Sequence, residues 1–288
     1  MSRVEFCGVE LEHALINASG TWDPLAARRA FGDKAFTEFP FAAHVTKTIT
    51  TEPRQGNPAP RIWEHAAGLI NSIGLPNKGL DRWLAEDLPE LVDLPVPLIV
   101  NVMGFSTAEL SLLVERVSAE TPAVAIELNV SCPNVETGTI VGSDPHECAA
   151  TVSAVRPLTR LPLIVKLTPN ATDPAEVARA AESAGADSVS LINTLRGLAF
   201  DPASGKPWLG GGTGGVSGPA VRNIALSQVH AVSQAVKVPV IGMGGVTSGA
   251  DADDMIRAGA RLVAVGTASF RDPLAVVSIR KTMSAMPV

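Results

Sequence analysis

Short runs of β-branched and other apolar residues recur along the chain, and segments with helical hydrophobic spacing separate them. This alternation is typical of βαβ units, because parallel strands are buried on both faces and read as continuous apolar runs. Eight β-then-α units in a chain of 288 residues predict an α/β fold of the (β/α)8 TIM-barrel type. The predicted strands are ALINASG (14–20), HVTKTIT (44–50), PLIVNVM (97–103), AVAIELNVS (123–131), LPLIVKLTP (161–169), ADSVSLINT (186–194), VPVIGMGGV (238–246) and ARLVAVGTA (260–268).

Two of the intervening helices carry clear start signals. The segment STAELSLLVERVSAE follows the capping pattern, with Ser106 as the cap and Glu109 three residues later. The segment DPAEVARAAESAG has Asp173 as cap and Pro174 in the first turn, and Gly185 marks its end. Both patterns place helices between consecutive strands, as the barrel requires.

The segments outside these units predict a single domain over residues 1–288 with insertions at the active site. The opening FCGVELEH predicts a small hairpin across the barrel bottom, and no proline- or serine-rich linker divides the chain. Two long irregular segments, residues 51–77 and 195–218, follow the second and sixth strands. Long segments of this kind are often lids or binding loops, and here both would lie on the catalytic face.

Polar residues and glycines gather at the predicted carboxyl ends of the strands, which face the active site in this fold. Paired glycine-containing turns after the seventh and eighth strands favour a phosphate site built from backbone N–H groups, although each pair alone could simply form a tight turn. The strand-end residues are Lys47, Asn101, Asn129, Lys166, Asn193, Thr194, Gly244, Gly245, Gly266 and Thr267.

Two lysines, Lys47 and Lys166, lie in otherwise apolar segments, VTKTI and IVKLTP. A lysine among core residues is rarely unpaired when buried, although a snorkelling side chain at a strand end would look the same. Two such lysines at one barrel mouth indicate an anionic group between them, such as a reduced flavin ring or a substrate carboxylate.

Asparagines and one cysteine complete the candidate site. An amide matches the alternating C=O and N–H edge of a pyrimidine or flavin ring, although any single asparagine is more often a turn residue. Cys132 differs from Cys7 and Cys148 because it follows the fourth predicted strand and precedes a proline. As a thiolate it could act as a general base.

Composition excludes several other classes of function. The formal net charge of −6 provides no basic surface for nucleic acid. Three widely spaced cysteines without a CxxC pair indicate neither a disulfide framework nor a metal site, and they favour a reducing cytoplasm. No signal peptide or membrane-spanning run is recognisable. The expected ligand is a small molecule, and we expect no nucleic acid, membrane or metal partner.

Nearly the whole chain resembles the FMN-dependent dihydroorotate dehydrogenases of pyrimidine synthesis. The resemblance implies oxidation of dihydroorotate to orotate, with Cys132 as the base and with hydride passing to FMN. A cysteine at this position resembles the soluble class 1 enzymes, because the membrane-associated class 2 uses serine. The segments that carry the resemblance to this family are INASG, VTKTIT, PRQGNPAPR, GLINSIGLPNKGL, IELNVSCPN, PLIVKLTPN, INTLRG, GGVSGPA, IGMGGV and AVGTASF.

The same resemblance assigns binding residues. The substrate would contact Lys47, Asn71, Ile73, Gly74, Leu75, Asn129, Asn134, Asn193 and Thr194. FMN would contact Ala18, Ser19, Lys47, Asn101, Asn129, Lys166, Ile192, Gly218, Gly244, Gly245, Gly266 and Thr267.

Within class 1 the chain most resembles the NAD-linked B type, whose catalytic subunit pairs with a subunit that carries FAD and a [2Fe-2S] cluster. A homodimer or heterotetramer is then expected. Three alternatives remain open at this point: an FMN-dependent dehydrogenase of a related dihydropyrimidine, including a relative from specialised metabolism; a non-redox phosphate-binding barrel; and a catalytically silent binding subunit.

Overall fold

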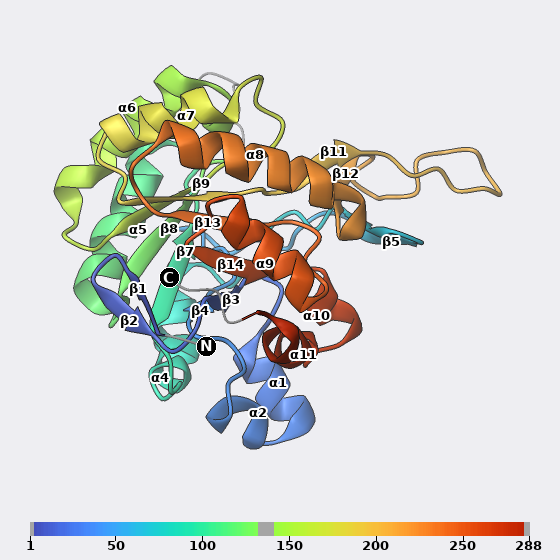
Figure 1. The fold of residues 1–288 in the computed structure, drawn as a ribbon, viewed down its shortest axis with the longest axis horizontal. Helices are drawn as coiled ribbons and strands as arrows, with labels where there is room; N and C mark the ends of the chain where they lie inside the picture. Colours follow the sequence, from blue (N-terminus) through green and yellow to red (C-terminus); the bar gives the residue numbers. More distant parts are fainter. Residues whose placement is uncertain (1–2, 132–140, 285–288) are drawn as a thin grey trace.

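Eight parallel strands form the centre of the molecule, and helices surround them (Figure 1). The computed structural model describes residues 3–131 and 141–284. Each of the eight predicted strand segments contains one strand of this sheet, which confirms the barrel prediction. In sheet order the strands are β3 (Leu15–Asn17), β14 (Leu262–Val265), β13 (Val240–Met243), β10 (Ser188–Leu191), β9 (Leu163–Lys166), β8 (Ala125–Asn129), β7 (Leu98–Val102) and β4 (His44–Val45).

The side chain of Asn17 closes the barrel between the two outermost strands, β3 and β4. Its Nδ2 donates to the carbonyl of Val45 at 2.7 Å, and the N–H of Val45 donates to its Oδ1 at 2.9 Å. The N–H of Ala42 also donates to the carbonyl of Leu15 at 2.9 Å. The side-chain amide of Asn17 therefore hydrogen-bonds the backbone of β4 where the two strands do not form a regular backbone ladder.

Helices cover the outer face of the barrel, and their starts follow the predicted caps. Ser106 accepts a hydrogen bond from the N–H of Glu109, and Asp173 accepts from the N–H groups of Ala175 and Glu176. The helices are α1 (Pro24–Phe31), α2 (Lys34–Thr37), α3 (Leu80–Arg82), α4 (Leu88–Leu91), α5 (Thr107–Glu120), α6 (Pro145–Val155), α7 (Pro174–Ser183), α8 (Arg222–Ala235), α9 (Gly249–Arg257), α10 (Ala268–Arg271) and α11 (Ala275–Thr282), with a π-helical turn at Trp83–Asp87 and 3-10 turns at Val141–Ser143, Arg156–Leu158 and Pro219–Val221.

The opening segment forms the predicted hairpin, with β1 (Val4–Phe6) antiparallel to β2 (Val9–Leu11). Val4, Phe6 and Leu11 pack with apolar residues from the barrel strands, among them Ile164. Ile164 is the second residue of β9, so the hairpin covers the amino-terminal ends of the strands. The site must therefore lie at the opposite end.

The two insertions form an antiparallel sheet, so the expectation that they are irregular was wrong. The first supplies β5 (Ile62–His65) and β6 (Gly68–Asn71), and the second supplies β11 (Leu195–Gly197) and β12 (Gly214–Ser217). The sheet order is β11-β12-β6-β5, and part of this sheet projects beyond the barrel (Figure 1). Because β6 pairs with β12, each insertion holds the other in place. Within the described ranges, no helix is both long and apolar enough to cross a bilayer.

Acid is expected to destabilise this fold through His44, which is buried in β4. Burial lowers the pKa of His44 to about 3, whereas an unfolded histidine titrates near 6.5. Stability should therefore fall as the pH decreases from about 6.5 to about 3, by up to about 5 kcal/mol from this group. Denaturant unfolding at several pH values should show a smaller decrease in His44→Phe and an unchanged decrease in His230→Gln, since His230 is exposed.

Candidate active site

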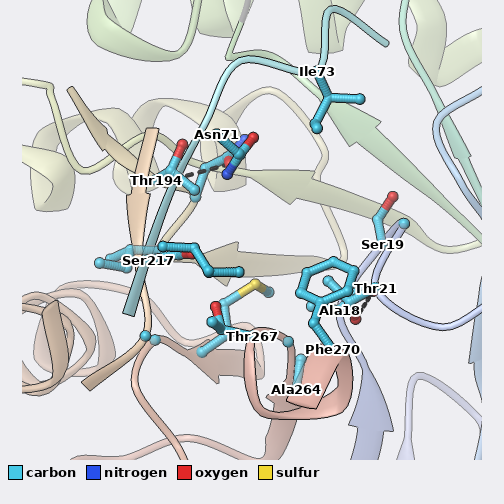
Figure 2. Close-up of a pocket in the computed structure, with 18 of the residues that line it drawn as sticks. Ala18, Ser19, Thr21, Asn71, Ile73, Thr194, Ser217, Ala264, Thr267 and Phe270 are labelled. Carbon is cyan, nitrogen blue, oxygen red and sulfur yellow. Dashed lines mark hydrogen bonds between the residues drawn. The ribbon is translucent and has the colours of Figure 1, made fainter. Parts of the chain in front are cut away.

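A cavity of about 400 Å³ opens at the carboxyl ends of the barrel strands, between the barrel and the insertion sheet. Figure 2 shows Phe270 beside Ala18 and Thr21, with Asn71 and Thr194 on another side of the cavity. Residues on the cavity wall that the sequence predicted are Ala18, Ser19, Lys47, Asn71, Ile73, Gly74, Leu75, Asn129, Lys166, Ile192, Asn193, Thr194, Gly218, Gly244, Gly245, Gly266 and Thr267.

Three predicted residues do not belong to this described wall. Cys132 and Asn134 lie outside the described residues. Asn101 is completely buried and does not line the cavity. Its Nδ2 instead donates to Glu127 Oε1 at 2.5 Å, so Asn101 supports the site from within the barrel.

Two lysines bring positive charge to the cavity. Lys166, the last residue of β9, is 6% exposed, and its Nζ lies 3.9 Å from Glu127 Oε1. Lys47 keeps exposed surface but makes no hydrogen bond or ion pair with a described residue. Burial of its amine and the nearby charge of Lys166 both lower the pKa of Lys47. An anion in the cavity would relieve this repulsion and favour the ammonium form.

The asparagines on the wall are fixed by hydrogen bonds to different parts of the structure. Asn71 Nδ2 donates to the carbonyl of Gly215 at 3.2 Å, which ties β6 to β12. Asn129 Oδ1 accepts from the N–H of Ser131 at 3.3 Å, and Asn193 Nδ2 donates to Ser131 Oγ at 2.8 Å. Two amides therefore hold the residue that directly precedes Cys132.

The loop that follows β6 reaches the cavity through an unusual backbone. Gly74 and Leu75 both have positive φ, 76° and 56°. A Cβ at Gly74 would lie 2.5 Å from the backbone nitrogen of Asn57, so only glycine fits there. Asn77 stabilises the end of the loop, because its Nδ2 donates to the carbonyl of Leu75 at 2.9 Å.

Glycines form the opposite side of the cavity. Gly218, Gly244 and Gly245 have φ of 94°, 128° and 73°. A Cβ at Gly245 would come within 2.6 Å of Arg222 Cβ, and one at Gly244 within 2.7 Å of Ala225 Cβ. The backbone that follows β13 can therefore pass close to α8 and line the cavity, as a phosphate site requires.

Sequence reasoning missed two residues at or next to the cavity, Glu127 and Thr48. Glu127 is a charged residue within the apolar run AVAIELNVS, which is the same signal that identified Lys166. Because side chains two residues apart lie on the same face of a strand, its spacing from Asn129 could have revealed it. Thr48 was also missed, although it lines the cavity and Asn129 Nδ2 lies 3.5 Å from its Oγ1. Within the described ranges, no His, Cys, Asp and Glu side chains gather in a group that could hold a metal ion.

The fold and the cavity define a (β/α)8-barrel protein with a cavity at the carboxyl ends of its strands, and Lys47 and Lys166 are among the residues that line it. The family described as dihydroorotate dehydrogenase matches residues 1–286, and the chain belongs to this family.

Individual relatives agree with this assignment. The chain is 47% identical over 282 residues to the "Dihydroorotate dehydrogenase B (NAD(+)), catalytic subunit" of Pelobacter propionicus, covering 97% of this chain and 91% of the relative. It is 43% identical over 277 residues to the protein of the same name from Bacillus pumilus, covering 95% and 87%. The structure titled "Crystal structure of DHODH in complex with ferulenol from Eimeria tenella" has a TM-score of 0.77 at 23% identity, covering 97% of this chain and 82% of that chain, and supports the fold.

Proposed function

We propose that this chain oxidises dihydroorotate to orotate in pyrimidine biosynthesis, with FMN as its cofactor. The observation that carries the proposal is the composition of the cavity: two lysines and three asparagines converge with glycine turns at the strand ends. The asparagine amides suit the C=O and N–H edge of a pyrimidine ring, and the lysines suit its carboxylate. Family membership favours this redox chemistry over a non-redox phosphate-binding barrel.

The residues around the cavity fit FMN. The turns at Gly244 and Gly245, together with Gly266 and Thr267, would hold the phosphate, and Lys166 would face the ring. The remaining contacts would come from Ala18, Ser19, Lys47, Asn129, Ile192 and Gly218. Asn101 would contribute indirectly, through its hydrogen bond to Glu127. When bound, FMN supplies the acceptor for the hydride that leaves ring carbon 6 of the substrate.

The substrate would lie between the asparagines and the loop after β6. Asn71, Asn129 and Asn193 would orient the ring, and the backbone of Ile73–Leu75 would close over it. Lys47 would attract the carboxylate, since it has no ion-pair partner among the described residues. Thr194 and Asn134 complete the proposed substrate set.

Cys132 would remove the proton from ring carbon 5. Support for this role comes from its immediate neighbour, because Asn129 and Asn193, which both line the cavity, hydrogen-bond to Ser131 just after β8. A base needs a fixed position near the proton that it removes, and two hydrogen bonds on the preceding residue would provide it.

The activity can be tested by product analysis. Purified protein, an artificial electron-accepting dye and dihydroorotate should yield orotate, whereas dihydrouracil, which lacks the carboxylate, should react at least about a hundredfold more slowly because it cannot pair with Lys47. Turnover of dihydrouracil alone would contradict the proposal and favour the related dihydropyrimidine dehydrogenases.

We further propose that the chain functions as a B-type catalytic subunit in the cytoplasm. A [2Fe-2S] cluster held by cysteines needs four thiolates, and this sequence has three cysteines, so such a cluster would belong to another chain. The partner would carry FAD and the cluster, in a heterotetramer built on a catalytic homodimer. NAD should be reduced by dihydroorotate only when this second subunit is present; NAD reduction by the catalytic chain alone would contradict the arrangement.

Gly245→Ala should weaken FMN binding by at least about tenfold, because a Cβ at this φ of 73° would lie 2.6 Å from Arg222 Cβ. Fluorescence titration of the apoprotein with FMN measures the effect. Gly205→Ala is the matched control, since Gly205 also has positive φ, 67°, but a Cβ there meets nothing within 4 Å. Equal FMN affinity of the two variants would contradict a phosphate site at Gly245.

A further inference from the structure

A buried carboxylate lies inside the barrel next to the cavity. Glu127 is 2% exposed, and both its oxygens are hydrogen-bonded: Oε1 accepts from Asn101 Nδ2 at 2.5 Å and Oε2 accepts from Ser190 Oγ at 2.9 Å. These donors come from β7 and β10, so they restrain the carboxylate from two sides. A buried charge is costly unless it is paired, and a barrel interior is normally filled by apolar side chains.

Lys166 is the charged partner of Glu127. The 3.9 Å between Nζ and Oε1 allows strong electrostatic attraction in a buried site but exceeds hydrogen-bond length. The ammonium donors of Lys166 therefore remain available to a ligand in the cavity, which Lys166 lines. Glu127 balances the charge of Lys166 without accepting a hydrogen bond from its ammonium group.

The charges around this pair add up to one net positive charge. Within the described part of the chain, Glu127 and Lys47 are the charged groups that face Lys166, and β7 and β10 contribute the neutral Asn101 and Ser190. Two ammonium groups and one carboxylate leave a charge of about +1. One negative charge on a reduced ring would balance it.

We propose that Glu127 is a positioning residue that holds Lys166 at the wall of the cavity where FMN would bind, and that it sets the charge of this site at one net positive. This role rests on the proposed FMN cofactor. Without Glu127, no carboxylate would offset the repulsion between the two lysines, and the site would stabilise a negatively charged ring more strongly. An apolar residue at position 127 could fill the same space but could not limit the charge.

Sulfite affinity and the midpoint potential of bound FMN test the role, because sulfite adds to the oxidised flavin ring and leaves it negatively charged. Glu127→Gln keeps the shape of the side chain, and its amide can accept from Asn101 Nδ2 and donate to Ser190 Oγ. In this variant sulfite should bind about tenfold or more tightly and the potential should become more positive. Ser190→Ala removes one hydrogen bond from the carboxylate but keeps its charge, so its sulfite affinity should stay within about twofold of wild type. Unchanged or weaker sulfite binding in Glu127→Gln would overturn the proposal.

A second test needs no flavin and therefore separates this inference from the proposed function. Thermal unfolding of the apoprotein is compared for Glu127→Gln, Lys166→Met and the double variant. Removing one member of a buried pair leaves the other charge uncompensated, so the loss of Tm in the double variant should be smaller than the sum of the two single losses. Additive losses would show that the two side chains do not interact and would overturn the proposal.

Discussion

We expect the Cys132→Ala variant to bind FMN as tightly as the wild-type protein but to lose most of its reduction by dihydroorotate. Positioned general bases contribute about a hundredfold to ten-thousandfold to proton transfer, so the rate should fall by at least about a hundredfold at neutral pH. Anaerobic stopped-flow mixing measures it directly. A near-normal rate of flavin reduction would refute the assignment of Cys132 as the base.

Cys148→Ala is the matched control for this experiment. Cys148 is completely buried in α6, and burial raises the pKa of its thiol to about 12, so it does not supply a thiolate near neutral pH. This variant should reduce its flavin at the wild-type rate. Cys132→Ser should keep some activity, mainly at higher pH, because a hydroxyl is a much weaker acid than a thiol.

The second large effect is expected for Lys47→Met. If the ammonium pairs with the substrate carboxylate, its removal should weaken dihydroorotate binding by about a hundredfold or more, as is usual when one member of a buried charged contact is lost. Binding of the product orotate, followed through the flavin spectrum, provides the measurement. Lys206→Met is the control, because Lys206 is exposed on the second insertion. Equal orotate affinity in the two variants would exclude Lys47 from the substrate site.

The pH dependence of orotate affinity gives a further test of Lys47. Burial and the charge of Lys166 lower the pKa of Lys47, so its positive charge is lost at a lower pH than for an ordinary lysine. Since the ammonium form attracts the carboxylate, orotate affinity should decrease as the pH rises through this lowered pKa. In Lys47→Met this decrease should be absent; a wild-type pH profile in that variant would assign the titration to another group.

The barrel could be predicted from sequence because its strands and helix starts leave signals within short segments of the chain. Each parallel strand is buried on both faces, so every one leaves a short apolar run, and helix caps such as Ser106 and Asp173 depend on residues that follow within one turn. The insertion sheet could not be predicted in this way. Its central pairing joins Asn71 to Gly215, which are 144 residues apart. In addition, β12 begins with two glycines, which are uncommon in strands.

The candidate site was partly predictable for the same reason. In this fold the carboxyl ends of the strands converge on the active site regardless of loop conformation. Lys47, Lys166 and Asn193 could therefore be assigned to one site from the sequence alone. Glu127 was missed because its role depends on Asn101 and Ser190, which belong to β7 and β10 and meet it only inside the closed barrel. Residue type alone does not reveal such a contact.

The absorption spectrum of the purified chain before and after anaerobic addition of dihydroorotate tests the central proposal most directly. The protein should be yellow from bound FMN, and the visible flavin absorption should bleach within one turnover as orotate forms. A yellow protein that stays unbleached by dihydroorotate, or a colourless one that does not take up FMN, would contradict the proposed function.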